Sequence, residues 1–415
     1  MTKEKSTVPR LRFPGFTDAW KQRKLGEVAE KISQKNLDRQ YVETFTNSAE
    51  FGIISQRDFF EKNISSLDNI SGYYIVSPDD FVYNPRISNL APVGPIKRNK
   101  LGRVGVMSPL YTIFRFSDIH LDFVEKYFDT TIWHRYMELN GNSGARSDRF
   151  AIKDSVFKGL PIPLPTHPEQ EAIGSFFSDL DQLITLHQRK LDDVKELKKA
   201  LLQKMFPKGN GNDFPELRFP EFTDAWKQRK FSDLAEVRRG LTYSPSAIRS
   251  HGVRVLRSSN INEDTFVFGE DDVFVDKSVV KIPLVEEGDI LITSANGSSR
   301  LVGKHSIIKG LPSNSAIHGG FMLLASSKVP CFLNAFMSST WYHKFIGLYV
   351  AGGNGAIGNL NKSDLDEQIV LVPTLPEQEA IGSFFSDLDQ LITLHQRQLD
   401  HLKLLKKALL QQMFI

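Results

Sequence analysis

Residues Pro168–Arg189 read PEQEAIGSFFSDLDQLITLHQR, and the same 22 letters recur without a mismatch at Pro376–Arg397. The similarity continues with 12 matches in the next 17 positions, to Phe206 and Phe414. A repeat of this kind is the strongest organising signal that a sequence can carry, because it shows which parts of the chain perform the same structural task.

A second repeated pair precedes each half of the chain. Residues Pro9–Lys24 and Pro215–Lys230 match at 14 of 16 positions and share FTDAWKQRK. Between the repeats lie residues 26–165 and 232–373, which are 140 and 142 residues long and align only at their edges. A solenoid repeats its whole unit, so this alternation of constant and variable segments predicts two divergent domains held by two nearly identical connectors.

The connectors are predicted to be helices. Thr166 can cap a helix, Pro168 suits its first turn, and Glu169 stands where it would close a capping box. Apolar residues then follow at heptad spacing, which is typical of a helix that packs along a partner helix. The predicted helix–helix contact residues are Ile173, Phe176, Leu180, Leu183 and His187, then Ile381, Phe384, Leu388, Leu391 and His395; Val194, Leu197 and Leu201 extend the first seam.

Two such helices of 39 residues would each be about 58 Å long. If a pseudo-twofold axis relates the halves, the helices run antiparallel, and His187 and His395, their midpoints, approach each other. The alternatives are two separate helices lying on their own domains, and a polar histidine position that sets register without any role in pH sensing.

The variable domains show a mixed pattern. Short β-rich runs occur at 73–76, 111–114 and 289–293, and helices are expected at 121–140 and 331–349. The predicted fold class is therefore α+β, with two α/β-mixed domains, two long antiparallel coiled-coil helices and a pseudo-twofold internal repeat.

Composition narrows the class of protein. The single cysteine, Cys331, excludes an internal disulfide framework and a cysteine-built zinc site. Neither a secretory signal nor a run of 18 apolar residues occurs, so a cytoplasmic protein without membrane contact is expected. The glycine-rich Gly297–His305 resembles a phosphate loop with the wrong spacing, and no other catalytic or metal-binding motif is found. We therefore predict no catalytic residue, no metal and no cofactor in this chain.

Clusters of Arg, Lys, Asn and Ser in both variable domains have the side chains that contact phosphates and base edges in DNA, although such clusters are also ordinary in solvated loops. The candidate DNA-binding residues are Asn84, Arg86, Lys97, Arg98, Lys100, Arg103, Asn142, Arg146, Arg149, Arg238, Arg239, Tyr243, Arg254, Arg257, Ser258, Asn260, Asn296, Ser298, Arg300, Lys304 and Asn354.

The whole architecture resembles the specificity subunit of type I restriction-modification systems. Each half opens with the FTDAWKQRK stretch and a short expected helix (LGEVAEK and FSDLAEVRR), and each variable domain exits through LPIPLP or IVLVPTLP into PEQEAIGSFFSDLDQLI. The resemblance covers nearly the whole chain. It implies target recognition domains at 1–165 (lead-in 9–25) and 207–373 (lead-in 215–231), with conserved helices at 166–206 and 374–415.

The resemblance also implies a function and partners. Each recognition domain would read one half of a split double-stranded DNA target, while the helices set the gap and dock two modification (methyltransferase) subunits. Two restriction subunits, for translocation and cleavage, would complete the complex. S-adenosylmethionine, ATP and Mg would be bound by those partners. Three alternatives remain at this point: a standalone DNA-binding or anti-restriction protein, a coiled-coil spacer with carbohydrate- or protein-binding heads, and a fused methyltransferase.

The charge distribution adds an expectation. The chain carries 52 basic and 49 acidic residues, a net charge of +3. Residues 26–165 net zero, with 17 of each sign, and residues 232–373 net −1, with 13 basic and 14 acidic groups. Without bulk positive charge, the domains should bind DNA weakly on their own and depend on partner subunits for much of the grip on phosphates.

Overall fold

The computed structural model describes residues 8–60, 70–143, 148–208, 213–350 and 359–415. The chain divides into two compact units: unit 1 is Met1–His187 with Gln398–Ile415, and unit 2 is Gln188–Arg397. Each unit therefore contains a stretch of both repeated segments. Among the residues described, no helix is long and apolar enough to cross a membrane.

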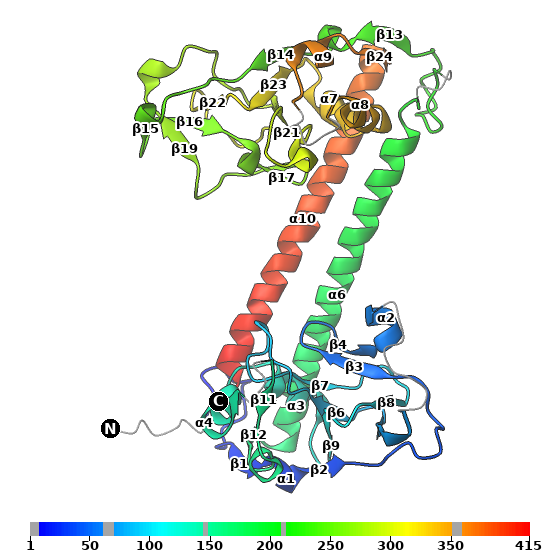
Figure 1. The fold of residues 1–415 in the computed structure, drawn as a ribbon, viewed down its shortest axis with the longest axis vertical. Coiled ribbons are helices and arrows are strands. Elements are labelled where there is room, and N and C mark those ends of the chain that lie inside the picture. The colour runs from blue at the N-terminus through cyan, green and yellow to red at the C-terminus, as the bar shows by residue number, and fades with distance from the viewer. Residues whose placement is uncertain (1–7, 61–69, 144–147, 209–212, 351–358) are drawn as a thin grey trace. The chain divides into compact units, whose positions relative to one another are not determined.

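The two predicted long helices are confirmed (Figure 1): α6 spans His167–Lys204 and α10 spans Leu375–Met413. The expected capping box is wrong. The fully buried Glu169 carboxylate instead accepts hydrogen bonds of 2.6 and 2.7 Å from Arg12, and Glu377 binds Arg218 in the same way. Burying an unpaired carboxylate costs more free energy than leaving out the reciprocal cap. The buried glutamate therefore pairs with an arginine of the lead-in segment.

In each unit the remaining elements begin with a strand of the lead-in and end with the strand that precedes the long helix. Unit 1 contains β1 (Lys21–Lys24), α1 (Leu25–Val28), β2 (Ala29–Ile32), β3 (Phe45–Ser48), β4 (Gly52–Ser55), α2 (Gln56–Phe60), β5 (Tyr74–Val76), β6 (Phe81–Tyr83), β7 (Ile96–Arg98), β8 (Gly105–Met107), β9 (Thr112–Phe116), α3 (Leu121–Phe128), α4 (His134–Asn140), β10 (Asn142–Ser143), β11 (Phe150–Ala151), α5 (Asp154–Phe157) and β12 (Pro161–Leu164). Unit 2 contains β13 (Lys227–Lys230), β14 (Glu236–Arg239), β15 (Ile248–Arg249), β16 (Val253–Leu256), β17 (Ile261–Asn262), β18 (Thr265–Phe266), β19 (Val273–Val275), β20 (Ile290–Thr293), β21 (His305–Ile307), β22 (Ala316–His318), β23 (Met322–Ser326), α7 (Pro330–Met337), α8 (Thr340–Val350), α9 (Lys362–Asp366) and β24 (Ile369–Val372), with short 3-10 turns between them.

A four-stranded antiparallel sheet forms the centre of each unit. Its strand order is β2-β9-β6-β7 in unit 1 and β14-β23-β20-β21 in unit 2. The central pairs have matching register, with Tyr83 opposite Thr112 in unit 1 and Thr293 opposite Met322 in unit 2. The two variable segments therefore share a central sheet that their sequences do not reveal, while the other strands differ: unit 2 adds a second four-stranded sheet, β15-β19-β16-β22, and unit 1 adds two-stranded sheets. The predicted strands around 73–76, 111–114 and 289–293 are confirmed as β5, β9 and β20.

Both helices expected inside the variable domains are interrupted. The region 121–140 forms α3 and α4, and 331–349 forms α7 and α8. At the first break the Thr130 hydroxyl donates to the Tyr127 carbonyl; at the second, Ser338 and Ser339 donate to the carbonyls of Asn334 and Phe336. Side chains that bond nearby backbone in this way compete with helix continuation.

The short helices expected at 25–31 and 231–239 are also largely wrong. Leu25–Val28 is α-helical and Phe231–Asp233 forms one 3-10 turn, but Ala29–Ile32 pairs with β9 and Glu236–Arg239 pairs with β23. Cross-strand pairing outweighs the helical preference of these residues because it places their backbone within the central sheet.

The C-terminal end of each long helix inserts a phenylalanine into an aromatic core. In unit 1, the Phe414 ring lies 5.4 Å from Phe123 and 6.2 Å from Phe177, with Trp20 and Tyr127 also in contact. In unit 2, Phe206 is surrounded in the same way, by Trp226, Phe332, Phe336 and Phe385. Residues 208 apart thus perform the same task in different units.

The buried stripe on the helices differs from the predicted seam. Ile173, Leu180 and Ile381 are buried as expected, and Phe176, Phe384 and Leu388 pack against the cores. Leu183 and Leu391, however, are 40% and 37% exposed, while their neighbours Ile184 and Ile392 are partly buried. Where two apolar residues are adjacent, as in Phe176-Phe177, the sequence does not show which of the two belongs to the buried stripe. A meeting of His187 and His395 stays a prediction, because they belong to different units.

Candidate nucleic-acid interface

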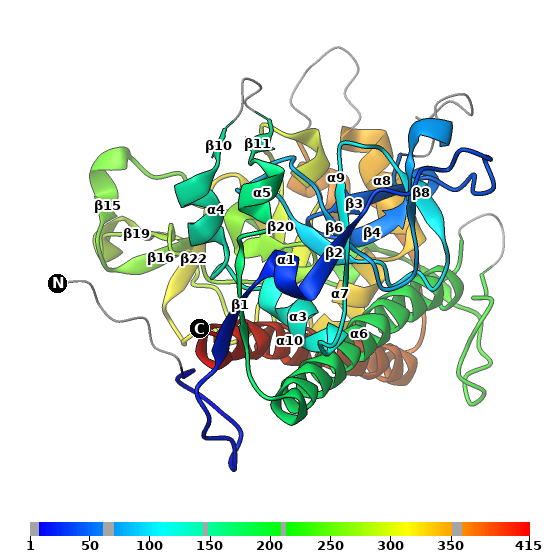
Figure 2. The same ribbon diagram turned by 90° about the horizontal axis from the view of Figure 1, so that it is seen from below.

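In unit 1, the loop that follows β6 is joined to the segment that follows the β10–β11 turn. Arg86 and Arg149 form an antiparallel bridge, the Ile87 amide donates to the Asp148 carbonyl, and the Phe150 amide donates to the Pro85 carbonyl. We call residues 84–94 with 148–150 the first loop cluster. Figure 2 shows the neighbouring β10–β11 hairpin beside α4 and α5. The structure thereby brings together Asn84, Arg86 and Arg149, three of the predicted residues.

Unit 2 contains a counterpart at the same end of its sheet. After β20, Ala295 bridges Asn359, and the Leu360 amide donates to the Ser294 carbonyl. The side-chain amide of Asn296 donates a hydrogen bond to the hydroxyl of Ser258 at 3.1 Å. We call residues 294–304, 319–321 and 359–360 the second loop cluster. Loops that are held by a rigid sheet yet differ between the units are where sequence-specific contacts are expected.

The predicted basic run of unit 1 lies elsewhere and is already paired. Residues Ile96–Arg98 form β7, which begins opposite Tyr83 and leads away from the first loop cluster. The ion pairs are Lys97–Asp129, Arg98–Asp79, Arg98–Asp122, Lys100–Glu125 and Arg103–Glu43. The carboxylates neutralise these cations, so DNA contact by this run stays a prediction that the geometry does not favour.

Part of this run belongs to a buried ion network. Lys126 contacts Asp129 at 3.3 Å and Asp181 at 2.5 Å, and Lys406 of α10 contacts Asp181 at 2.6 Å. Burial alone would raise the pKa of Asp129, but Lys97, Lys126 and Lys406 outweigh it and lower the pKa to about 2. Burial would lower the pKa of Lys126, but Asp129, Glu125 and Asp181 raise it instead. This network joins Asp181 of α6 and Lys406 of α10 to the region of α3 within unit 1.

Several predicted residues of unit 2 are likewise occupied within the unit. Arg238 contacts Asp289 and Ser326, and Arg254 pairs with Asp272 while lying over the rings of Phe268 and Phe274. Arg257 pairs with Asp271. Asn260 is fully buried; it accepts a hydrogen bond from the Arg257 amide and donates to Asp272. Asn84 in unit 1 is also buried, and its side chain donates to the Asn47 carbonyl. These contacts indicate structural roles.

Other predicted residues remain open to solvent. Tyr243 and Arg149 are half-buried, and Arg146 and Asn354 lie outside the described residues. Apart from the ion-paired Lys100 and Arg103, the exposed candidates are Arg86, Asn142, Arg239, Ser298, Arg300 and Lys304. Four of these six belong to the sheet end that holds the second loop cluster, because Arg239 ends β14 beside Leu323 and residues 298–304 connect β20 to β21.

Two exposed phenylalanines are absent from the candidates that the sequence predicts. Phe321, in the second loop cluster, is 74% exposed, and its carbonyl accepts hydrogen bonds from the amides of Ser294 and Ala295 at 2.9 and 3.2 Å. Phe51 is 61% exposed at the tip of the β3–β4 hairpin, where its ring lies 6.3 Å from that of Phe59, which is 41% exposed. The candidates were chosen for polar side chains, and the Gly319-Gly320 pair before Phe321 is the sequence signal that marks this turn.

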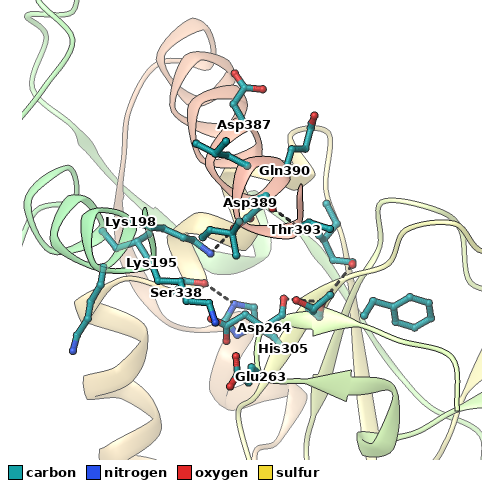
Figure 3. Close-up of a pocket in the computed structure, with 18 of the residues that line it drawn as sticks. Lys195, Lys198, Glu263, Asp264, His305, Ser338, Asp387, Asp389, Gln390 and Thr393 are labelled. Atoms are coloured by element: carbon teal, nitrogen blue, oxygen red, sulfur yellow. Dashed lines mark hydrogen bonds and ion pairs between the residues drawn. The ribbon is translucent and has the colours of Figure 1, made fainter. Parts of the chain in front are cut away.

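A cleft of about 1270 Å³ in unit 2 lies between the helices and the recognition fold (Figure 3). Lys198 and Asp389 pair across its helical side at 2.6 Å, and on the other side the His305 ring meets the Ser338 hydroxyl at 3.2 Å. Burial lowers the pKa of His305, and the Ser338 hydroxyl donates to the Asn334 carbonyl. This arrangement stabilises the fold of unit 2. Among the described residues, no group of three or more His, Cys, Asp or Glu side chains is placed to hold a metal ion.

The sequence model of the type I restriction modification DNA specificity domain matches residues 17–196 and 223–404. Among curated proteins, the MjaVIII specificity subunit of Methanocaldococcus jannaschii is 22% identical over 270 residues, which cover 62% of this chain and 62% of that protein. The EcoKI specificity subunit of Escherichia coli is 25% identical over 238 residues, 55% of this chain and 51% of that protein. The chain thus spans less than two thirds of the length of these relatives.

Solved structures show the same fold. The S subunit of a type I restriction-modification system from M. genitalium aligns with a TM-score of 0.61 at 14% identity, over 98% of this chain and 99% of that one. A chain from a structure concerning complex assembly and conformational transition of the type I R-M system aligns with a TM-score of 0.52 at 13% identity, over 95% and 97%. The family match occurs twice and covers most of the chain, and each copy lies mostly within one unit. The chain belongs to the type I restriction-modification DNA specificity family.

Proposed function

We propose that the chain is the non-catalytic specificity subunit of a type I restriction-modification complex, and that each unit reads one half of a bipartite double-stranded DNA target. The observation that carries this proposal is the pair of loop clusters. Each cluster lies at the corresponding end of the central four-stranded sheet of its own unit, yet the side chains of the two clusters differ. One fold with two surfaces fits two unlike half-sites on one DNA molecule.

The loop clusters supply the contacts in this proposal. Arg86 in unit 1, and Arg239, Arg300 and Lys304 in unit 2, are exposed cations suited to guanine edges and phosphates. Asn296 and Ser258 offer an amide and a hydroxyl beside them. Arg146 and Asn354 remain proposed contacts on their residue type alone.

The long helices act as a ruler in this scheme. Lys406 pairs with Asp181 in unit 1 and Lys198 pairs with Asp389 in unit 2, and these residues correspond at an offset of 208. Equivalent contacts at opposite ends of α6 and α10 support an antiparallel pair related by a pseudo-twofold axis. DNA repeats about every 34–36 Å, so helices of about 58 Å could hold two readers on neighbouring turns.

The same symmetry suits two identical partners. Leu183 and Leu186 of α6 and their equivalents Leu391 and Leu394 of α10 are all exposed. Repeated apolar side chains on a helix surface are fitted to docking a protein, here two modification subunits, with two restriction subunits completing the complex. S-adenosylmethionine, ATP and Mg belong to those partners in this proposal. The charge balance of the variable segments supports dependence on them for phosphate binding.

The ruler is tested by lengthening both helices together. Duplicating seven residues, 184–190 in α6 and 392–398 in α10, should lengthen the gap between half-sites by about three base pairs, because seven helical residues add about 10 Å. Methylation sequencing of cells that carry the variant with its partner subunits gives the result. Half-sequences that change, with the gap constant, would contradict the ruler.

A standalone DNA-binding or anti-restriction protein is the second candidate, favoured by the fact that all of the proposed base contacts lie within this chain. Co-purification decides between the two. A methyltransferase subunit that co-purifies with the tagged chain supports the restriction-modification complex. Its loss in a Leu183→Asp/Leu391→Asp variant would place its docking surface on the long helices.

A further inference from the structure

Phe321 has an unusual setting beside the second loop cluster. Its side chain is 74% exposed, yet the backbone of its turn is held in place, because the Phe321 carbonyl accepts hydrogen bonds from the amides of Ser294 and Ala295. A single exposed apolar residue needs no explanation by itself. A large ring on a fixed turn, among the polar side chains of the second loop cluster, calls for one.

The turn that carries Phe321 has little freedom. A side chain on Gly240 would meet the Gly319 carbonyl oxygen at 1.9 Å, and one on Gly320 would meet the Thr242 hydroxyl at 2.5 Å. The Gly319 amide also donates to the Leu256 carbonyl. Gly240 and Gly320 therefore allow the turn that carries Phe321 to lie close to the end of β14.

The surroundings of Phe321 are those of a DNA contact. Arg239 lies at the end of β14, opposite Leu323. In the neighbouring loops, the Asn296 side chain donates a hydrogen bond to Ser258. In the major groove, the only apolar group that marks a base is the thymine methyl, and phenylalanine is among the side chains that contact it. A protein-docking ring would more usually lie among other exposed apolar residues than among Arg, Asn and Ser.

We propose that Phe321 is a specificity-determining residue that contacts a thymine methyl group in the half-site read by unit 2. The inference rests on the proposed DNA-reading function and deepens it. Apolar contacts of this kind discriminate bases without adding positive charge, which agrees with the near-neutral variable segments.

The test uses the full chain in its assembled complex and duplexes that carry the target found by methylation sequencing. Each thymine of the unit 2 half-site is replaced in turn by deoxyuridine, which lacks only the methyl group. One such position should weaken binding by the wild-type complex about fourfold to tenfold. The Phe321→Ala complex should bind the thymine duplex that much more weakly and no longer distinguish thymine from uracil there.

Matched variants separate this role from others. Leu348→Ala removes a side chain that is 81% exposed on α8 of the same unit and should leave binding unchanged. Lys304→Ala should reduce the slope of log affinity against log salt by about one, whereas Phe321→Ala should leave the slope unaltered.

Two results would overturn the inference. One is a Phe321→Ala complex that still distinguishes thymine from uracil at every position as the wild type does; the other is a variant that fails to assemble with its partners, which would assign the ring to a protein interface. Both leave the DNA-reading function intact. That function itself would fail if exchanging unit 2 left both half-sites unchanged.

Discussion

Replacing Phe414 with alanine is expected to destabilise unit 1 by about 3–5 kcal/mol, the usual cost of removing a large buried aromatic side chain. Phe414 is 4% exposed and touches four aromatic rings, from the lead-in, α3 and α6. The change should release residues 398–415, and hydrogen exchange followed by peptide mass spectrometry should show faster exchange across unit 1.

The matched variant is Phe206→Ala, which removes the equivalent ring from unit 2 and should accelerate exchange there instead. Leu404→Ala, at a position of α10 that is 67% exposed, should change little. If Phe414→Ala left exchange in unit 1 at the level of Leu404→Ala, the helix end would not contribute to that core.

Replacing Asp129 with asparagine is expected to cost unit 1 about 3 kcal/mol, because it removes a carboxylate shared by three lysines and leaves Lys126, which is 4% exposed, with fewer partners. The loss should depend on pH. The folded pKa of Asp129 is about 2, below the ordinary value of about 3.9. Its contribution is therefore complete above pH 4 and disappears as the pH falls towards 2.

Urea denaturation between pH 2 and pH 7, with unit 1 followed by hydrogen exchange, checks this expectation. The free energy of unfolding of the wild type should fall below pH 4 by about 2–3 kcal/mol more than that of Asp129→Asn. Asp79→Asn is the control, because the Asp79 side chain is 53% exposed and its pair with Arg98 should contribute less than about 1 kcal/mol. Parallel pH profiles for the wild type and Asp129→Asn would contradict the role assigned to this carboxylate.

Repetition made the connectors predictable, because an apolar periodicity that occurs twice in nearly identical form leaves little doubt about a helix. The same periodicity could not decide between Phe176 and Phe177, since both are apolar and only the packing around Phe414 selects one. Strand pairing over 29–32 and 236–239 was hidden for a related reason: the pairing partners lie 80 or more residues away.

The candidate site was predictable only in part. Residue type found Arg86, Arg239, Arg300 and Lys304, which are exposed, but it equally selected Arg98, Arg238 and Arg254, which carboxylates hold. Sequence proximity cannot show which acid lies opposite a given arginine across a sheet. The residue types did not suggest Phe321 either. The exposure of its ring depends on a glycine-containing turn that is hydrogen-bonded to a loop 26 residues earlier in the chain.

Exchanging residues 232–373 for the corresponding segment of another member of the family tests the central claim most directly. Genome-wide sequencing of modified bases, in cells that carry the chimera with its partner subunits, reports the full target. One half-site should be replaced, while the other half-site and the gap between them stay as in the parent. A target in which both half-sites change, or neither does, would contradict the assignment of one half-site to each unit.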